Sequence, residues 1–480
     1  MNREELLKLE KEEIIDILFA VIEQQAKTIG QLTLKVAELE ARLNQNSKNS
    51  SNPPSSDKFG NPTPKSLRKP SGKKPGGQKG HKGSGLRIMQ EPDQYIEHHP
   101  SDCECCPNAG SCAERKQIGE TRYSIDIKIE TETTAHQTLY VLCPRSNKMI
   151  EGKFPEHITG TTQYGVNLAA LAISLNTDGA VSINRTHEIL SNVFNIPISN
   201  GTISNMVSGC AQIVQPQVDE IKEAVENAPI IHNDETGIRI DKKTHWAHVA
   251  STALLTYIAI HCKRGREAMD AIGVLLNYCG TSIHDCLASY FTFGGIRHGL
   301  CNAHLLRELT AVVENTKQKW AEELIELLLE MKAYKERRLG QGKNKASPQA
   351  FRKYSNRYDG ILTIAMEQNP ILPKIAGRKP KRGKTGALVD RLLLRKDGFL
   401  LFFTDFSVPF DNNQAERDIR MFKTKQKVSG GFRTVDGAKD YASIMSYTGT
   451  ARKHGIPPFI SIRDALLGSP FSLKSVIATE

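Results

Sequence analysis

Apolar residues between positions 15 and 43 recur in alternating steps of three and four, which is the spacing of one face of a helix. Sustained heptads of this kind favour a coiled coil that joins two copies of a chain, and a single helix packed on its own protein is the alternative. We expect residues 1–45 to be an oligomerisation helix. The stripe consists of Ile15, Leu18, Ile22, Gln25, Ile29, Leu32, Val36, Leu39 and Leu43, with Gln25 as its polar member.

Residues 229–237 form a short apolar run that ends in acidic residues. A run of this length predicts a buried strand, from whose end Asp234 projects into a cleft. Two β-rich runs follow, at 245–251 and 254–261, and they predict a three-stranded meander. On its own, an Asp at a strand end is usually a turn residue, so its role depends on what lies around it.

The next segments supply a second carboxylate. Residues 264–278 have helical apolar spacing, and residues 280–285 form another short strand that ends in Asp285. In this order the first and fourth strands become parallel neighbours, so we expect Asp234 and Asp285 at the same edge of one sheet. Carboxylates at adjacent strand ends repel each other unless a cation lies between them.

A third acid follows a long helical stretch. Residues 295–301 predict a fifth strand, and residues 316–400 contain only helical patterns, which indicates an insertion. Residues 411–413 then cap a helix that carries Glu416 in its first turn. A basic stripe on this helix suits a phosphate backbone, and a simple ion pair between Glu416 and its helix neighbour is the alternative. The stripe is Arg420, Lys423 and Lys427.

Residues 159–225 are predicted to be helical, with a break at 196–198 between two helices. This outline is typical of a helix-turn-helix, although helical hairpins without DNA are also common. The second helix offers polar side chains suited to base edges and phosphates. These are Asn200, Thr202, Ser204 and Asn205.

The charge balance favours an anionic partner, because 64 Lys and Arg face 53 Asp and Glu, for a formal net charge of +11. Residues 46–90 begin rich in Asn, Ser and Pro and continue with basic residues, which predicts a flexible arm that binds DNA phosphates. A solubilising linker is the alternative. No apolar run approaches the ~20 residues of a membrane helix, so we expect a cytoplasmic protein without a membrane partner. The DNA-binding candidates of the arm are Lys73, Lys74, Lys79 and Lys82.

Cysteines crowd into residues 91–158, whereas those from Cys210 to Cys301 are scattered through apolar segments like core thiols. Cys103 and Cys106 have the C-x2-C spacing of a zinc half-site, and no second pair follows in register. Cys112 with Cys143, or His136, would complete four ligands; degenerate finger or buried thiols are the alternatives.

Several short motifs, in this order, make the chain resemble the IS66 family of bacterial insertion-sequence transposases. They are Asn49-Ser50-Ser51-Asn52-Pro53-Pro54-Ser55-Ser56-Asp57, Pro75-Gly76-Gly77-Gln78-Lys79-Gly80-His81, Asp234-Glu235-Thr236, Cys301-Asn302-Ala303-His304-Leu305-Leu306-Arg307-Glu308-Leu309, Asn412-Asn413-Gln414-Ala415-Glu416-Arg417 and Ser446-Tyr447-Thr448-Gly449-Thr450-Ala451-Arg452-Lys453-His454-Gly455. The departure from the family pattern is the missing second C-x2-C pair.

The resemblance implies an α/β fold with an RNase H-like mixed-sheet catalytic core, an α-helical insertion, and a preceding coiled coil, zinc finger and helical DNA-binding region. The domains would be 1–45 coiled coil, 46–90 basic arm, 91–158 finger-like, 159–225 DNA-binding, 226–315 first part of the core, 316–400 insertion, and 401–480 last part of the core with the Glu-bearing helix. Carried over residue by residue, the catalytic, metal-binding triad is Asp234, Asp285 and Glu416.

The implied activity is DNA transposition with two Mg²⁺ or Mn²⁺ ions, about 4 Å apart, on the scissile phosphate. His304 and Arg307 would lie behind the metal ligands or contact DNA, and Zn²⁺ would belong to the finger. The implied partners are the element's terminal inverted repeats, target DNA, a second copy of the chain and small accessory proteins, in a protein associated with the nucleoid when bound. A catalytically inactive DNA-binding regulator and a nuclease or resolvase that cuts without joining are the two rival functions.

Overall fold

The computed structural model divides into two compact units, Lys65–Phe154 and the combination of Met1–Pro64 with Pro155–Glu480. The basic-arm residues Lys73, Lys74, Lys79 and Lys82 and the cysteines Cys103, Cys106 and Cys112 lie outside the described residues, so their predicted roles stay predictions. The described residues are 10–46, 49–50, 91–96, 98, 118–127, 130–155, 158, 160–371 and 383–473.

The smaller unit contains an antiparallel hairpin of β1 (Tyr140–Cys143) and β2 (Lys148–Glu151). Asn147 takes a positive φ of 52° in the turn, a conformation that Asn tolerates better than most residues. Cys143, the predicted zinc ligand of this hairpin, has a free thiol, and His136 is exposed.

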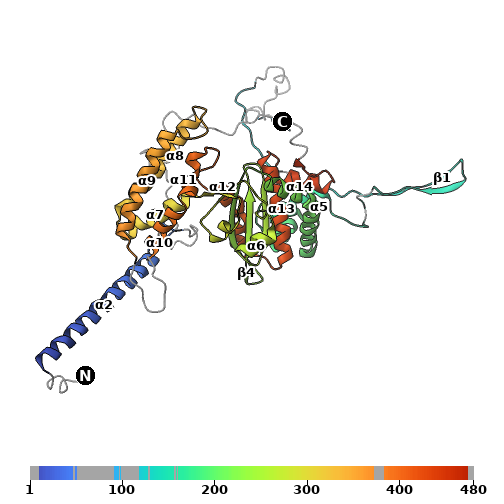
Figure 1. Ribbon diagram of the computed structural model, residues 1–480. Coiled ribbons are helices and arrows are strands. Elements are labelled where there is room, and N and C mark those ends of the chain that lie inside the picture. Colours follow the sequence, from blue (N-terminus) through green and yellow to red (C-terminus); the bar gives the residue numbers. More distant parts are fainter. Residues whose placement is uncertain are drawn as a thin grey trace. The chain divides into compact units, whose positions relative to one another are not determined.

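The N-terminal heptads form α2 (Lys11–Leu43), a helix of 33 residues (Figure 1). Its stripe is exposed in this single chain: Ile22 is 59% and Ile29 63% accessible. The helix is as expected, and its pairing with a second copy stays a prediction.

The larger unit is built on a mixed five-stranded sheet with the order β5-β4-β3-β6-β7. The first three strands form the expected antiparallel meander, and β6 and β7 run parallel to β3 and to each other. The predicted parallel pairing of the first and fourth strands is therefore confirmed. The strands are β3 (Ile230–Ile240), β4 (Lys243–Ser251), β5 (Thr256–His261), β6 (Thr281–His284) and β7 (Arg297–Leu300).

The largest difference from a predicted strand boundary is at the end of β3. β3 continues to Ile240, so Asp234 lies inside the strand and not at its end. The antiparallel pairing with β4 extends the strand up to a turn at Asp241 and Lys242, both with positive φ. The sequence nevertheless located the point where the parallel partner β6 stops.

Helices cover both faces of the sheet, but each face of β3 is fully buried over only part of its length. On one face, Ile238 and Ile240 pack with α12 (Asn413–Ser429) and α13 (Val435–Lys453). On the other face, Ile231 packs with the end of α5 (Asn200–Glu226), α6 (Arg266–Ile272) and the 3-10 turn η4 (Ala288–Thr292). Alternate residues of β3 therefore meet two different environments.

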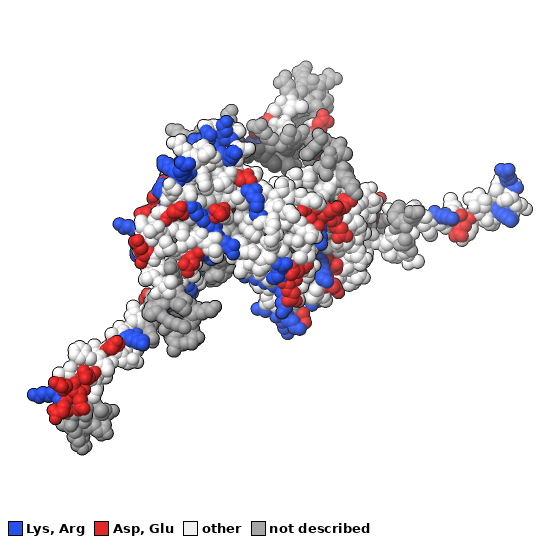
Figure 2. Space-filling view, viewed as in Figure 1, with Lys and Arg blue, Asp and Glu red and all other residues white. Residues whose placement is uncertain are grey.

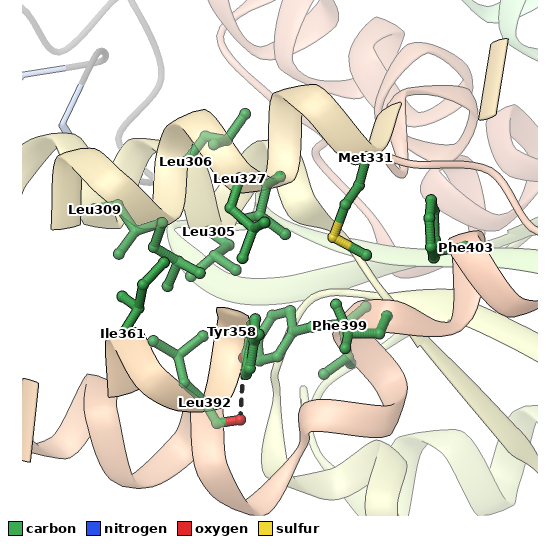
Figure 3. Packing of buried hydrophobic residues seen from close by; sticks show 14 of the residues in the cluster. Leu305, Leu306, Leu309, Leu327, Met331, Tyr358, Ile361, Leu392, Phe399 and Phe403 are labelled. Carbon is green, nitrogen blue, oxygen red and sulfur yellow. Dashed lines mark hydrogen bonds between the residues drawn. The ribbon is translucent and has the colours of Figure 1, made fainter. Parts of the chain in front are cut away.

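The predicted helical insertion forms a cluster of helices between β7 and α12 in the sequence (Figure 1). Its apolar side chains share one core, in which the Tyr358 hydroxyl donates to the Leu392 carbonyl oxygen at 3.2 Å (Figure 3). This core includes Ile283 and Leu300 of the sheet, which ties the insertion to the edge that carries Asp285. Its helices are α8 (Lys319–Leu339), α9 (Pro348–Gln368), α10 (Gly383–Leu394) and α11 (Lys396–Thr404), and α7 (Asn302–Thr316), which precedes the predicted insertion, packs in the same core.

The region before the sheet has three helices, α3 (Val166–Asn176), α4 (Ile183–Phe194) and α5. The helix α14 (Pro458–Leu466), near the C-terminus of the chain, packs against α3 and α5. As expected, α5 restarts after the break at a Ser199 cap, whose hydroxyl accepts from the Thr202 amide at 3.0 Å. It is, however, 27 residues long and not short, because its later turns pack against α13.

Basic and acidic side chains are interspersed over the face of the molecule seen in Figure 2. The longest basic stretch without an acid in the sequence is the run from Lys58 to Arg87, which has nine basic residues. Among the described helices, none is long and apolar enough to cross a membrane.

Candidate active site

Asp234 and Asp285 lie on neighbouring parallel strands. The paired residues end with His232 opposite Ile283, and continuing this register by two residues sets Asp285 level with Asp234. Asp285 follows the last residue of β6, where its carboxylate accepts from the Leu287 amide at 2.9 Å. The parallel register is what brings these two acids together from positions 51 residues apart.

Glu416 reaches the same place from α12. Asn412 precedes this helix and is 2% exposed, and its side chain turns inward, with the amide nitrogen donating to the Asn233 carbonyl oxygen at 2.8 Å. Its amide oxygen lies 2.9 Å from Nδ1 of His232. The sequence predicted Asn412 as a cap, but the side chain makes no capping bond and instead fixes the start of α12 to β3.

The first turn of α7 borders Glu416 from the side of the insertion. Oε1 of Glu416 lies 3.6 Å from Nδ1 of His304 and 3.7 Å from a guanidinium nitrogen of Arg307. The buried Cys301 thiol stands just before this helix and accepts from the Asn412 amide at 3.2 Å. Burial, reinforced by the charge of Arg307, lowers the pKa of His304 and favours a neutral imidazole.

The carboxylate next to Asp234 is directed to the other face of the sheet, as strand alternation requires. The Glu235 side chain is fully buried, and its two oxygens accept from Arg264 at 2.8 Å and from the Tyr290 hydroxyl at 2.8 Å. Arg264 also lies 3.8 Å from Asp285 and stacks over the Trp246 ring. Glu235 therefore anchors the arginine that reaches Asp285.

The three acids influence one another electrostatically. Burial raises the pKa of Asp234 well above its usual range, and the charges of Glu235, Glu416 and Asp285 add to that rise. Oε1 of Glu416 is buried and has no hydrogen-bond partner among the described residues. Concentrated negative charge and a carboxylate oxygen left without a donor both suit a divalent cation with oxygen ligands.

The remaining predicted contacts fall into two groups. Lys423 turns inward, where its ammonium donates to the Gly237 carbonyl oxygen at 2.6 Å and links α12 to β3. Arg420 and Lys427 are exposed on α12. At the start of α5, Asn200 and Ser204 are exposed, while the Thr202 hydroxyl is 2.9 Å from that of Ser199.

Sequence reasoning missed the roles of Arg264, Tyr290 and the Asn412 side chain, because no local pattern connects them with the acids. It also treated all scattered cysteines as core thiols, whereas Cys262 and Cys279 are exposed. Cys301 is buried as expected, and burial raises the pKa of its thiol to about 12. The Cys301-Asn302-Ala303-His304 segment served only as a motif of the family resemblance, although its C-x2-H spacing is a signal for a site at this point.

These features define a mixed α/β protein with a cluster of acids at the point where two parallel strands meet a helix. Over residues 161–440, the chain matches the family described as Transposase IS66 family, and it therefore belongs to this transposase family. Its N-terminal residues 2–87 match a family of unknown function, DUF6444.

Two proteins of Sinorhizobium fredii (strain NBRC 101917 / NGR234) are similar along most of their length. The uncharacterized protein y4jD is 22% identical over 403 residues, which cover 78% of this chain and 76% of that protein. The uncharacterized protein y4hP is 22% identical over 401 residues, which cover 78% of this chain and 72% of that protein. Their names carry no activity, so the argument for function rests on the family and on the site.

Proposed function

We propose that this chain is the transposase of a bacterial insertion sequence, which binds the element's terminal inverted repeats and catalyses DNA strand cleavage and strand transfer. The observation that carries the proposal is the convergence of Asp234, Asp285 and Glu416 from two parallel strands and a helix. A mixed sheet with this strand order, an acid on its first strand and a helical insertion before the last acid is consistent with an RNase H-like core.

Asp234, Asp285 and Glu416 are the residues that would hold Mg²⁺ or Mn²⁺. The fit rests on the raised pKa of Asp234 and on Oε1 of Glu416, which has no hydrogen bond among the described residues, since both indicate a site organised for a positive charge. When bound, such ions neutralise the scissile phosphate and activate the attacking oxygen.

The protein's own groups have separate tasks in this reaction. Water attacks phosphorus, the bond to the 3′ oxygen breaks, and the freed 3′-OH then attacks a phosphodiester of target DNA and displaces a second 3′ oxygen. Arg264 and Arg307 lie beside Asp285 and Glu416 and limit the repulsion between acids and phosphate. Asn412 orients Glu416 by fixing the start of α12.

DNA binding is assigned to surfaces outside the three acids. The run from Lys58 to Arg87 supplies sequence-independent attraction to phosphates. Exposed polar residues at the start of α5 and the exposed Arg420 and Lys427 of α12 are the candidates for contacts with the element's ends. In this proposal Lys423 is a structural link and not a phosphate contact.

The heptad stripe of α2 pairs two copies of the chain and so brings two DNA ends together. Exposed side chains such as Leu32 (58%) and Val36 (53%) support this assignment, because their burial needs a partner. Light scattering of the full chain should give a dimer or larger assembly, and Leu32→Lys should shift it toward monomer. Gln24→Lys, on the polar side of α2, is the control; a monomeric wild type would contradict the pairing.

The decisive experiment is a cleavage and strand-transfer assay on the element's own ends with Mg²⁺ or Mn²⁺, together with any small proteins that the element encodes. We expect both products from the wild type and neither from Asp285→Asn, while binding to the ends persists. Cleavage without joining would indicate a nuclease or resolvase. Binding with no cleavage in either metal would indicate a DNA-binding regulator.

A further inference from the structure

Cys301, His304 and Glu416 bring three different kinds of ligand atom together. A thiol sulfur, an imidazole nitrogen and a carboxylate oxygen all lie within 4.8 Å of one another. Cys301 and His304 flank the first turn of α7, and Glu416 stands opposite them in the first turn of α12. Two elements separated by the whole helical insertion therefore meet at this point.

Two of these atoms lack a hydrogen bond among the described residues, although Oε1 of Glu416 has a guanidinium nitrogen of Arg307 at 3.7 Å. In the described part of the chain, Nδ1 of His304 and Oε1 of Glu416 are both buried without a hydrogen bond, and they lie 3.6 Å apart. A buried polar atom left unsatisfied costs about 1–3 kcal/mol, so two adjacent ones need an explanation. A cation between them would satisfy both at once.

The third ligand atom, Sγ of Cys301, is held by a backbone hydrogen bond. Sγ of Cys301 accepts from the backbone amide of Asn412 at 3.2 Å, and Cys301 is 2% exposed. Donation from a fixed amide stabilises negative charge on sulfur and orients the side chain. The sulfur is thus held toward the position that the His304 and Glu416 atoms share.

We propose that Cys301, His304 and Glu416 form a binding site for a thiophilic divalent cation of the Zn²⁺ class, which competes with the hard cation of the three carboxylates for Glu416. Sulfur and imidazole ligands select zinc-like ions, whereas magnesium takes oxygen ligands. On binding, the thiol releases its proton and the sulfur bonds to the ion. Water would supply the fourth ligand of a tetrahedral ion.

The separations are compatible with this ion after a small adjustment. Bonds of about 2.0–2.3 Å at tetrahedral angles place ligand atoms roughly 3.5 Å apart. All three ligand atoms lie within 4.8 Å of one another, so small side-chain shifts bring them to this spacing. A Glu416 oxygen bonded to this ion is no longer free to bond the cation of the three carboxylates, which is why the two cations compete.

The competition rests on the proposed function, but the binding does not. Binding is tested by titrating the full, reduced and chelator-treated chain with Co²⁺, read by thiolate-to-metal absorption, and with Zn²⁺ by calorimetry. We expect Cys301→Ser and His304→Gln each to bind one ion fewer per chain than wild type at matched concentrations. Because changing groups that only support a ligand costs about 10–100-fold in affinity, loss of a ligand should cost at least that much.

The control is Cys279→Ser, which removes an exposed cysteine and should leave the number of bound ions unchanged. Comparing variants of the full chain also cancels any ions held by the cysteines of residues 103–143. Thermal unfolding of each variant checks that it is folded. If Cys301→Ser does not fold, His304→Gln still tests the site. Equal stoichiometry and affinity in wild type and both variants would overturn the site.

Competition is read in the cleavage assay as the ratio of rates with and without Zn²⁺ at fixed Mg²⁺, each protein compared with itself. We expect Zn²⁺ to slow the wild type and Cys279→Ser by at least tenfold, and to slow Cys301→Ser much less. An equal ratio in all three would overturn the competition while the binding result stands. A wild type that never cleaves counts against the proposed function alone.

Discussion

Asp234 and Glu235 are consecutive residues of β3 with opposite surroundings. Glu235 faces α6 and η4, where Arg264 and the Tyr290 hydroxyl take up its two oxygens. Asp234 is directed to the face that α12 covers, and its pKa is raised well above the usual range, first by burial and then by the charges of Glu235, Glu416 and Asp285. β3 thus carries two adjacent carboxylates, of which Glu235 is paired with an opposite charge and Asp234, within the part of the chain that the structure describes, is not.

The contrast indicates a structural role for Glu235 and a chemical role for Asp234. A buried charge is tolerated when hydrogen bonds and an opposite charge replace water, and Glu235 meets both conditions. Burial and the charge of Asp285 still raise the pKa of Glu235, and its two partners oppose that rise. Asp234 accepts a hydrogen bond from the Glu235 backbone amide at 2.9 Å but has no ion pair among the described residues. A buried acid that other acids repel is a candidate for ligand binding.

The largest effect should come from removing the Asp234 charge. Loss of a metal ligand forfeits several kcal/mol of transition-state stabilisation, and with about 1.36 kcal/mol per tenfold, cleavage by Asp234→Asn should fall by at least ~10³. The matched change Glu235→Gln should cost no more than about 10- to 100-fold, as for groups that only support a ligand. Gel-based cleavage rates on the element's ends measure both; equal losses would remove the distinction between the two faces.

The free energy of unfolding should depend more on Glu235 than on Asp234. Glu235→Ala leaves Arg264 and the Tyr290 hydroxyl without their acceptor, and breaking a buried pair in this way typically costs about 3 kcal/mol. Denaturant unfolding should therefore shift clearly for Glu235→Ala. Glu323→Ala, which removes an exposed carboxylate on α8, is the control and should change the free energy of unfolding by less than about 0.5 kcal/mol. An unchanged Glu235→Ala midpoint would contradict the structural role of Glu235.

The sequence was sufficient for the architecture around the acids. Short apolar runs, a helical run and another short strand predicted that β3 and β6 are parallel neighbours, because strand and helix periodicities differ and connections are short. Strand alternation also requires that the side chains of Asp234 and Glu235 face opposite ways. The helical insertion followed from apolar spacing alone, and Figure 3 shows the core that this spacing builds.

The contacts between distant side chains could not be predicted. Nothing near Asn412 indicates that its amide binds β3 rather than capping α12, and nothing near Lys423 indicates that Gly237 accepts its ammonium. Arg264 and Tyr290 reach Glu235 from other elements. Such pairs depend on how helices settle on the sheet, and that depends on packing over the whole core.

Adding a divalent cation should stabilise the face of β3 that carries Asp234. A ligand that binds only the folded state adds about 2.7 kcal/mol at one hundred times its dissociation constant. We expect Mg²⁺ or Mn²⁺ to raise the unfolding temperature of wild type and of Glu235→Gln, and to leave Asp234→Asn unchanged. Calorimetric scans with and without chelator measure this difference. A similar rise in Asp234→Asn would place the cation elsewhere.

The smallest expected effect concerns the hydrogen bond from the Tyr290 hydroxyl to the Glu235 carboxylate. Tyr290→Phe removes one donor and keeps the ring that stacks on His284 at 4.3 Å between centroids. One Glu235 oxygen then loses its buried hydrogen bond, which costs about 1–2 kcal/mol, while Arg264 still neutralises the charge. The free energy of unfolding should fall by less than in Glu235→Ala, and the Mg²⁺-dependent rise should persist. A loss as large as that of Glu235→Ala would mean that the hydroxyl, and not the Arg264 ion pair, is what makes a buried carboxylate tolerable on this face of β3.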